Sequence, residues 1–187
     1  VHITRFATMS VVIPTRSVKL DGKIDTWGEL VPISAGTGIN FMGDPRFGVT
    51  GLYVCKDAKY LYWRVDFKEA NPEASPPKGI KDSIIEQLVF QLKDPLSLNI
   101  GIQKMRSSDP SMYAYATVWN DNTKRGSDIT NADIQYKSSA SMLVGRIGLS
   151  AIAKYLVGSL PTRIDVSNEP DSSSHVATPA RDVVFPE

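Results

Sequence analysis

The sequence is poor in the residues that build several common kinds of site. Its 187 residues include a single cysteine, Cys55, and two histidines, His2 and His175. A lone cysteine excludes an internal disulfide and a cysteine-based metal cluster, and without a Cys-x-x-Cys-His motif a covalently attached c-type haem is excluded as well. No zinc motif, phosphate-binding loop or hydrolase-type Ser/His/Asp order occurs, so we expect a protein without its own catalytic site.

Strong charge and long apolar runs are also missing. Lys and Arg number 21 against 20 Asp and Glu, so nothing points to nucleic acid or to an anionic membrane surface. No apolar run reaches the ~20 residues of a membrane-spanning helix. The chain begins at Val1 and not at Met, which indicates a removed leader or a trimmed chain. With the scarcity of cysteine, we expect a periplasmic or extracytoplasmic location.

What the sequence does contain is alternation of apolar and polar residues, which is typical of β-strands. Residues 49–56 and 60–68 alternate on either side of a short turn and predict a hairpin. One face of the second stretch is apolar and should meet the core: Leu61, Trp63, Val65 and Phe67. The opposite face is amphipathic and should line a pocket or a subunit contact: Tyr60, Tyr62, Arg64 and Asp66.

Many further short strands are predicted, with one helix. The strands are expected at 8–13, 17–20, 29–34, 83–92, 98–103, 112–119, 134–136, 142–147, 163–167 and 182–185. Polar loops are expected at 120–131 and 168–179, and a helix at 151–157 with Ser150 as its N-cap. This pattern predicts an all-β protein, an antiparallel β-sandwich with one short helix, formed by residues 1–187 as a single domain.

Four segments carry a resemblance to a known superfamily of β-sandwiches. They are VKLDGKIDTW at 18–27, AKYLYWRVD at 58–66, KDSIIE at 81–86 and VGRIGLS at 144–150. The chain resembles family 9 carbohydrate-binding modules, DOMON domains and the haem b γ subunits of ethylbenzene dehydrogenase-like molybdenum enzymes. The resemblance implies the fold. It does not choose the function, because sugar binders and haem binders share the pattern.

Two positions favour the haem b branch of this superfamily. Met105, in QKMRSSDP at 103–110, precedes the aromatic strand and occupies the place of a Met ligand. His175, in SSSHVAT at 172–178, occupies the place before the last strand where the γ subunits typically have Lys. The resemblance thus implies a non-covalent haem b with Met105 and His175 as axial ligands. Candidates for the wall of the haem pocket are Ile100, Ile102, Met112, Tyr113, Tyr115 and Trp119.

An iron with both axial positions filled would transfer single electrons without bond chemistry. The resemblance implies an electron-transfer subunit whose partners are molybdenum/iron–sulfur oxidoreductase subunits and a soluble electron carrier. Met42 is an alternative sulfur ligand, and Lys137 and Lys154 are fallback ligands by residue type.

Two other functions compete with electron transfer. A non-catalytic carbohydrate-binding module of the family 9 type would need exposed aromatic rings beside amides and carboxylates, and WNDN at 119–122 fits that description. A purely structural or adhesion sandwich is the third hypothesis. Ca²⁺ is a second candidate cofactor because hard oxygen ligands are present, although not at the spacing of a calcium loop: Asp21, Asp25, Asp66, Asp82 and Glu86.

Overall fold

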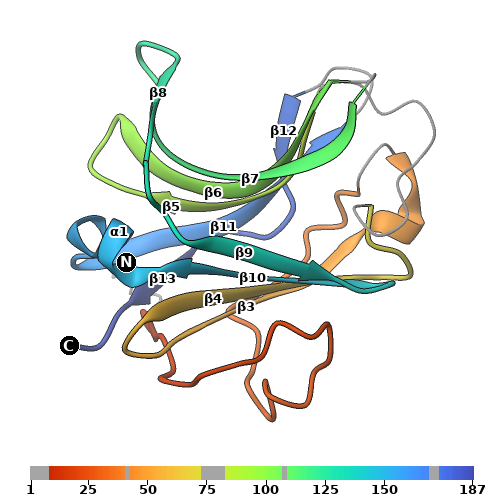
Figure 1. Cartoon of the computed structure of the whole chain (residues 1–187), viewed down its shortest axis with the longest axis horizontal. Coiled ribbons are helices and arrows are strands. Elements are labelled where there is room, and N and C mark those ends of the chain that lie inside the picture. The colour runs from red at the N-terminus through yellow and green to blue at the C-terminus, as the bar shows by residue number, and fades with distance from the viewer. Residues whose placement is uncertain (1–8, 41–42, 73–82, 107–108, 169–172) are drawn as a thin grey trace, which may run out of the picture.

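Two β-sheets pack face to face (Figure 1). The computed structural model describes residues 9–40, 43–72, 83–106, 109–168 and 173–187, without the side chains of 83–85, 104–106, 109–112, 167–168 and 173. Nearly all strand pairs are antiparallel, the exception being β1 with β13. The predicted antiparallel β-sandwich is therefore confirmed. In the described part of the chain no helix has both the length and the apolar character needed to cross a membrane.

The larger sheet has the strand order β1-β13-β11-β5-β6-β7-β8, with β12 also paired to β11. Its strands are β1 (Val11–Val12), β5 (Ser83–Gln91), β6 (Leu96–Arg106), β7 (Asp109–Asn120), β8 (Arg125–Asp128), β11 (Ser159–Asn168), β12 (Ser173–Val176) and β13 (Arg181–Val184). Strands β5, β6 and β7 follow one another along the chain as a meander and form the centre of this sheet.

The smaller sheet has the order β2-β3-β4-β10-β9. Its strands are β2 (Ser34–Ala35), β3 (Val49–Lys56), β4 (Tyr60–Phe67), β9 (Ile134–Ser138) and β10 (Met142–Gly148). Strands β3 and β4 form the predicted hairpin. Short helical segments lie at η2 (Pro45–Phe47), α1 (Leu149–Ile152) and η3 (Ala153–Tyr155).

Several sequence-based boundaries were wrong. The helix begins at Leu149, before the predicted start, with Gly148 at the N-cap position and no side-chain cap hydrogen bond, so Ser150 is not its cap. Residues 17–20 form no strand, and of 29–34 only Ser34 does, in β2. The two predicted polar loops contain the edge strands β8 and β12. These edges are polar because a neighbouring strand, not an apolar face, holds them in place.

The core between the sheets is built on the apolar face of β4. Leu61, Trp63 and Val65 are fully buried there, as predicted. The indole of Trp63 lies directly against Gly145, its partner on β10. It packs so closely that a Cβ atom at Gly145 would overlap the ring. A glycine at this one position therefore provides the room in which the largest core side chain packs.

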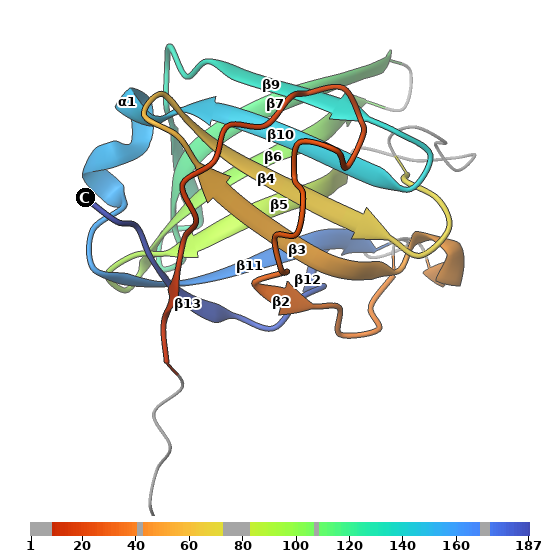
Figure 2. The same ribbon diagram turned by 90° about the horizontal axis from the view of Figure 1, so that it is seen from below.

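The other face of β4 is covered by the chain itself. Residues 14–33 cross the outer surface of β3 and β4 (Figure 2). Trp27 and Val18 from this segment pack with Tyr62 in a second apolar cluster, and the Arg64 guanidinium lies 3.8 Å from the centre of the Tyr53 ring. This face of β4 was predicted to line a pocket or a subunit contact. Instead, Tyr62 and Arg64 are buried under the N-terminal segment.

One carboxyl group lies within the core. Glu86 of β5 is fully buried, and its Oε1 accepts a hydrogen bond of 3.2 Å from Nε1 of Trp63. Its Oε2 has no hydrogen-bond partner among the described residues. Burial raises the pKa of Glu86 to about 8, against a smaller opposing effect of the Trp63 hydrogen bond. The group is therefore protonated at neutral pH in the folded protein.

Replacing Gly145 with alanine should destabilise the protein severely. The new methyl group would push Trp63 out of its site and break its hydrogen bond to Glu86, so we expect a loss on the order of 3 kcal/mol or more. Gly148→Ala on the same strand is the matched control, since its Cβ would meet only ordinary contacts at 3.6 Å and beyond. Urea denaturation of both variants measures the difference. Equal losses would show that Gly145 has no special packing role.

The stability of the wild-type protein should fall, relative to Glu86→Gln, as pH rises from about 5 to 9. The native state holds the Glu86 proton up to about pH 8, whereas the unfolded chain releases it near pH 4.5, the ordinary pKa of a glutamate. The contribution of the Glu86 proton to stability is then fully present below pH 4.5 and is lost as pH rises to about 8, by an amount on the order of 5 kcal/mol. Free energies of unfolding measured at several pH values test this. Parallel pH curves for the two proteins would contradict it.

Candidate functional site

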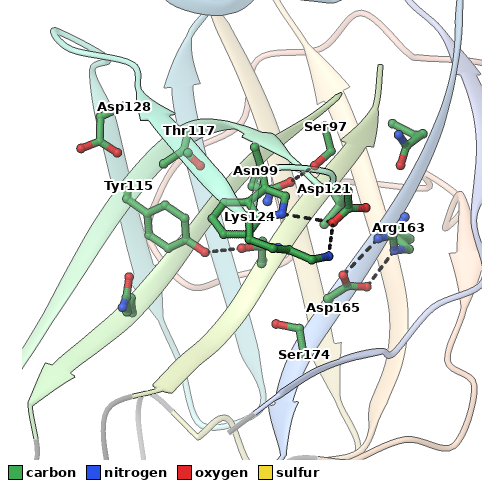
Figure 3. A pocket seen from close by; sticks show the side chains of 16 residues that line it. Ser97, Asn99, Tyr115, Thr117, Asp121, Lys124, Asp128, Arg163, Asp165 and Ser174 are labelled. Atoms are coloured by element: carbon green, nitrogen blue, oxygen red, sulfur yellow. Dashed lines mark hydrogen bonds and ion pairs between the residues drawn. The ribbon is translucent and has the colours of Figure 1, made fainter. Parts of the chain in front are cut away.

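The outer face of the larger sheet is hollowed into a trough. Strands β6 and β7 bend at both ends away from the smaller sheet, so the face turned to solvent is concave (Figure 1). The hollow has a volume of about 950 Å³. Its side chains come from β12, β11, β5, β6, β7, β8 and the turn between the last two (Figure 3): Gln87, Val89, Gln91, Ser97, Asn99, Gln103, Tyr115, Thr117, Trp119, Asp121, Lys124, Gly126, Asp128, Arg163, Asp165 and Ser174.

The strand register arranges these residues in rows that cross the sheet. One row consists of successive cross-strand partners from β11 to β8: Arg163, Val89, Asn99, Thr117 and Asp128. Partners in an antiparallel sheet point to the same face, so these side chains form a continuous strip. We call this strip the floor row. Val89 is 1% exposed and Asn99 is 8% exposed, so its central part is closely packed.

Two aromatic rings of β7 lie on either side of the floor row. Tyr115 is the cross-strand partner of Gly101, where a Cβ atom would lie 2.8 Å from the tyrosine hydroxyl. Trp119 is the partner of Gly126, where a Cβ atom would lie 3.3 Å from the indole. Each ring therefore packs over a glycine on the neighbouring strand. This arrangement shields the glycine and leaves one face of the ring towards solvent.

Hydrogen bonds hold both rings in place. The Tyr115 hydroxyl donates to Oε1 of Gln87 at 2.5 Å, and Nε1 of Trp119 donates to Oδ1 of Asp121 at 3.2 Å. Burial raises the pKa of Tyr115. The negative charge of Asp165 raises it further, as does that of Glu86 once Glu86 has lost its proton. The hydroxyl therefore stays a donor across the physiological range.

Both cations of the trough are paired with aspartates. Arg163 makes a bidentate ion pair with Asp165, with Nε 2.9 Å from Oδ1. Nζ of Lys124 lies 3.4 Å from Oδ1 of Asp121 (Figure 3). Asp128 adds one exposed carboxylate at the β8 edge. The trough is therefore polar and almost neutral, with its positive charges already compensated.

The six residues predicted for a haem wall are divided between the two faces of the sheet. Tyr115 and Trp119 line the trough, whereas Ile100 and Ile102 are fully buried in the core on the opposite face. Tyr113 is 44% exposed and does not line the trough. The side chain of Met112 lies outside the described residues. The six therefore do not form one wall.

The predicted axial ligands belong to β6 and β12, which are separated by β5 and β11 in one sheet. His175 is the partner of the buried Val166, so it lies on the core side of the sheet, opposite to the trough. The side chain of Met105 is outside the described residues, as is Met42. The alternative ligands Lys137 and Lys154 are both exposed, on β9 and beside Tyr155. The ligand assignment stays a prediction.

The candidate calcium ligands are dispersed. Glu86 is buried in the core, Asp66 is paired with Arg64, and Asp82 lies outside the described residues. Asp21 accepts a hydrogen bond from the backbone of Lys23, as a turn residue does. Over the described part of the chain, no three or more His, Cys, Asp or Glu side chains gather as a metal site.

Most of the trough was not predicted from the sequence. WNDN at 119–122 was identified, and Trp119 and Asp121 do line the trough, but Gln87, Asn99 and Arg163 were missed. A signal was present in β6, where the polar residues Ser97, Asn99 and Gln103 alternate with Leu98, Ile100 and Ile102. Such a pattern indicates a solvent-facing surface, but not which strands lie side by side.

Comparison with known proteins adds little to this picture. No protein-family model matches the chain, and no curated protein matches it. Among solved structures, the chain is similar to a family 9 carbohydrate-binding module from Caldicellulosiruptor kristjanssonii in complex with glucose. The two are 13% identical, the match covers 95% of this chain and 96% of that one, and the TM-score is 0.47.

Proposed function

We propose that this chain is a non-catalytic β-sandwich that binds carbohydrate in the trough of its larger sheet. The observation that carries the proposal is the combination, in one open hollow, of two flat rings with a dense set of amides, hydroxyls and carboxylates. A pyranose has C–H groups that pack on an aromatic face and a rim of hydroxyls that need donors and acceptors. Trp119 and Tyr115 supply the first kind of contact, and side chains such as Asn99 supply the second.

The same surface suits an apolar cofactor poorly. Most side chains of the trough are polar. Binding an apolar molecule there would displace their water without replacing its hydrogen bonds, which costs free energy. A sugar would replace those waters with its own hydroxyls. The charge balance supports the same choice, because Arg163 and Lys124 already have carboxylate partners.

Trp119→Ala should abolish or greatly weaken glycan binding. The variant removes the larger ring, and we expect at least a tenfold loss of affinity, which equals about 1.4 kcal/mol. Affinity gel electrophoresis in soluble polysaccharides measures it. Tyr60→Ala is the control, because Tyr60 lies on the outer face of the smaller sheet and contacts Asp133. Undiminished binding by Trp119→Ala would place the site elsewhere, and binding of no glycan by the wild type would refute the proposal.

Electron transfer through a haem b is the second candidate. The observation in its favour is that Ser174 and Gln103, which border the trough, are close in sequence to His175 and Met105. In this hypothesis Met105 and His175 hold the iron, and the chain relays single electrons for a molybdenum/iron–sulfur oxidoreductase. The polar lining and the core-side position of His175 favour the glycan proposal.

An absorbance spectrum after reconstitution with hemin tests the second candidate. Axial ligation predicts a sharp Soret band near ~400 nm that shifts in Met105→Ala and in His175→Ala. A spectrum identical in wild type and both variants would indicate adventitious haem and exclude the ligand pair. Glycan retention by the same preparation decides between the two functions.

A further inference from the structure

We propose that the trough holds an internal segment of a neutral polysaccharide, running across the strands, and not a single terminal sugar. This inference rests on the proposed glycan-binding function and specifies its ligand. It is carried by three observations: the direction of the trough, the place of its rings and the pairing of its charges.

The direction follows from how the sheet bends. Because β6 and β7 rise at both ends, the lowest line of the concave face runs across the strands and not along them (Figure 1). The floor row follows that line from Arg163 on β11 to Asp128 on β8. Four strand spacings of about 4.8 Å give about 19 Å of continuous floor. A hollow of about 950 Å³ lies at the upper end of the usual range of about 300–1,000 Å³ for ligand pockets. Both dimensions exceed one pyranose ring.

The rings flank this line. Trp119 and Tyr115 are four residues apart on β7, about 14 Å at 3.4 Å per residue, with Thr117 of the floor row between them. A chain lying on the floor row would pass between the two rings, with Asn99 and Thr117 beneath it. Neither ring closes an end of the trough, so the arrangement allows the polymer to continue in both directions.

The charges select a neutral polymer. Arg163 is compensated by Asp165 at the β11 end, and Lys124 by Asp121 in the turn between β7 and β8. A uronic acid would have to displace one of these aspartates and would also approach the carboxylate of Asp128. Neutral hydroxyls can use the same groups as donors and acceptors without breaking either ion pair.

Chain length is the direct test. The full chain is first run in gels containing hydroxyethylcellulose, xylan, glucomannan or polygalacturonate. Calorimetry then measures its affinity for oligosaccharides of the polymer that retains it, from the monomer to the hexamer. We expect a neutral polymer, an affinity that rises at least tenfold from monomer to tetramer, and a borohydride-reduced hexamer that binds within twofold of the unreduced one. A monomer that binds as tightly as the hexamer, loss of binding on reduction, or preference for polygalacturonate would overturn this inference alone. Retention by no polymer would also overturn the proposed function.

Asp165→Asn tests the selection against acidic chains. The variant frees Arg163 in the trough, and we expect retention by polygalacturonate to increase at least threefold. Asp66→Asn is the matched control, because Asp66 pairs with Arg64 in the same two-pronged way on the opposite sheet. No gain in Asp165→Asn, or an equal gain in both variants, would show that the ion pairs do not set the selectivity.

Discussion

The contact between Trp63 and Glu86 joins the two sheets and determines what each face of the larger sheet presents. Trp63 is placed by Gly145, and its indole donates to the Glu86 carboxyl across the core. Since side chains alternate along a strand, burial of Glu86 turns the next residue, Gln87, to the opposite face. There Gln87 accepts the hydrogen bond of Tyr115. The packing of the core thus determines the position of a residue that holds one ring of the trough.

An aromatic ring packed over a cross-strand glycine occurs both in the core and in the trough. In the core, Trp63 packs over Gly145, and in the trough, Tyr115 and Trp119 pack over Gly101 and Gly126. In each case a missing side chain on one strand makes room for a ring on its neighbour. The core ring is enclosed on all sides, whereas the trough rings are half-buried and keep one surface towards solvent. A packing solution that stabilises the sheets also provides flat surfaces for a ligand.

The sequence predicted those parts of the fold that depend on local alternation. The β3–β4 hairpin and the buried face of β4 were confirmed because a strand with one apolar face shows a period of two. Strands β8 and β12 were missed because their residues are polar and depend on a partner strand. The floor row could not be predicted for a related reason. Arg163, Val89 and Asn99 become neighbours only through the pairing of β11, β5 and β6, and alternation within each strand leaves that register undetermined.

The coverage of the smaller sheet explains why the larger one carries the candidate site. Residues 14–33 lie over β3 and β4 and bury Tyr62 and Arg64, so the polar groups of that face already have partners within the chain. Over the described residues, the larger sheet carries no such layer along β5, β6 and β7, and its polar side chains face solvent in a concave surface. A sandwich that covers one outer face with its own N-terminal segment leaves the other to a ligand. The row of amides and hydroxyls between two rings makes a polyhydroxylated chain the ligand that best replaces the water there.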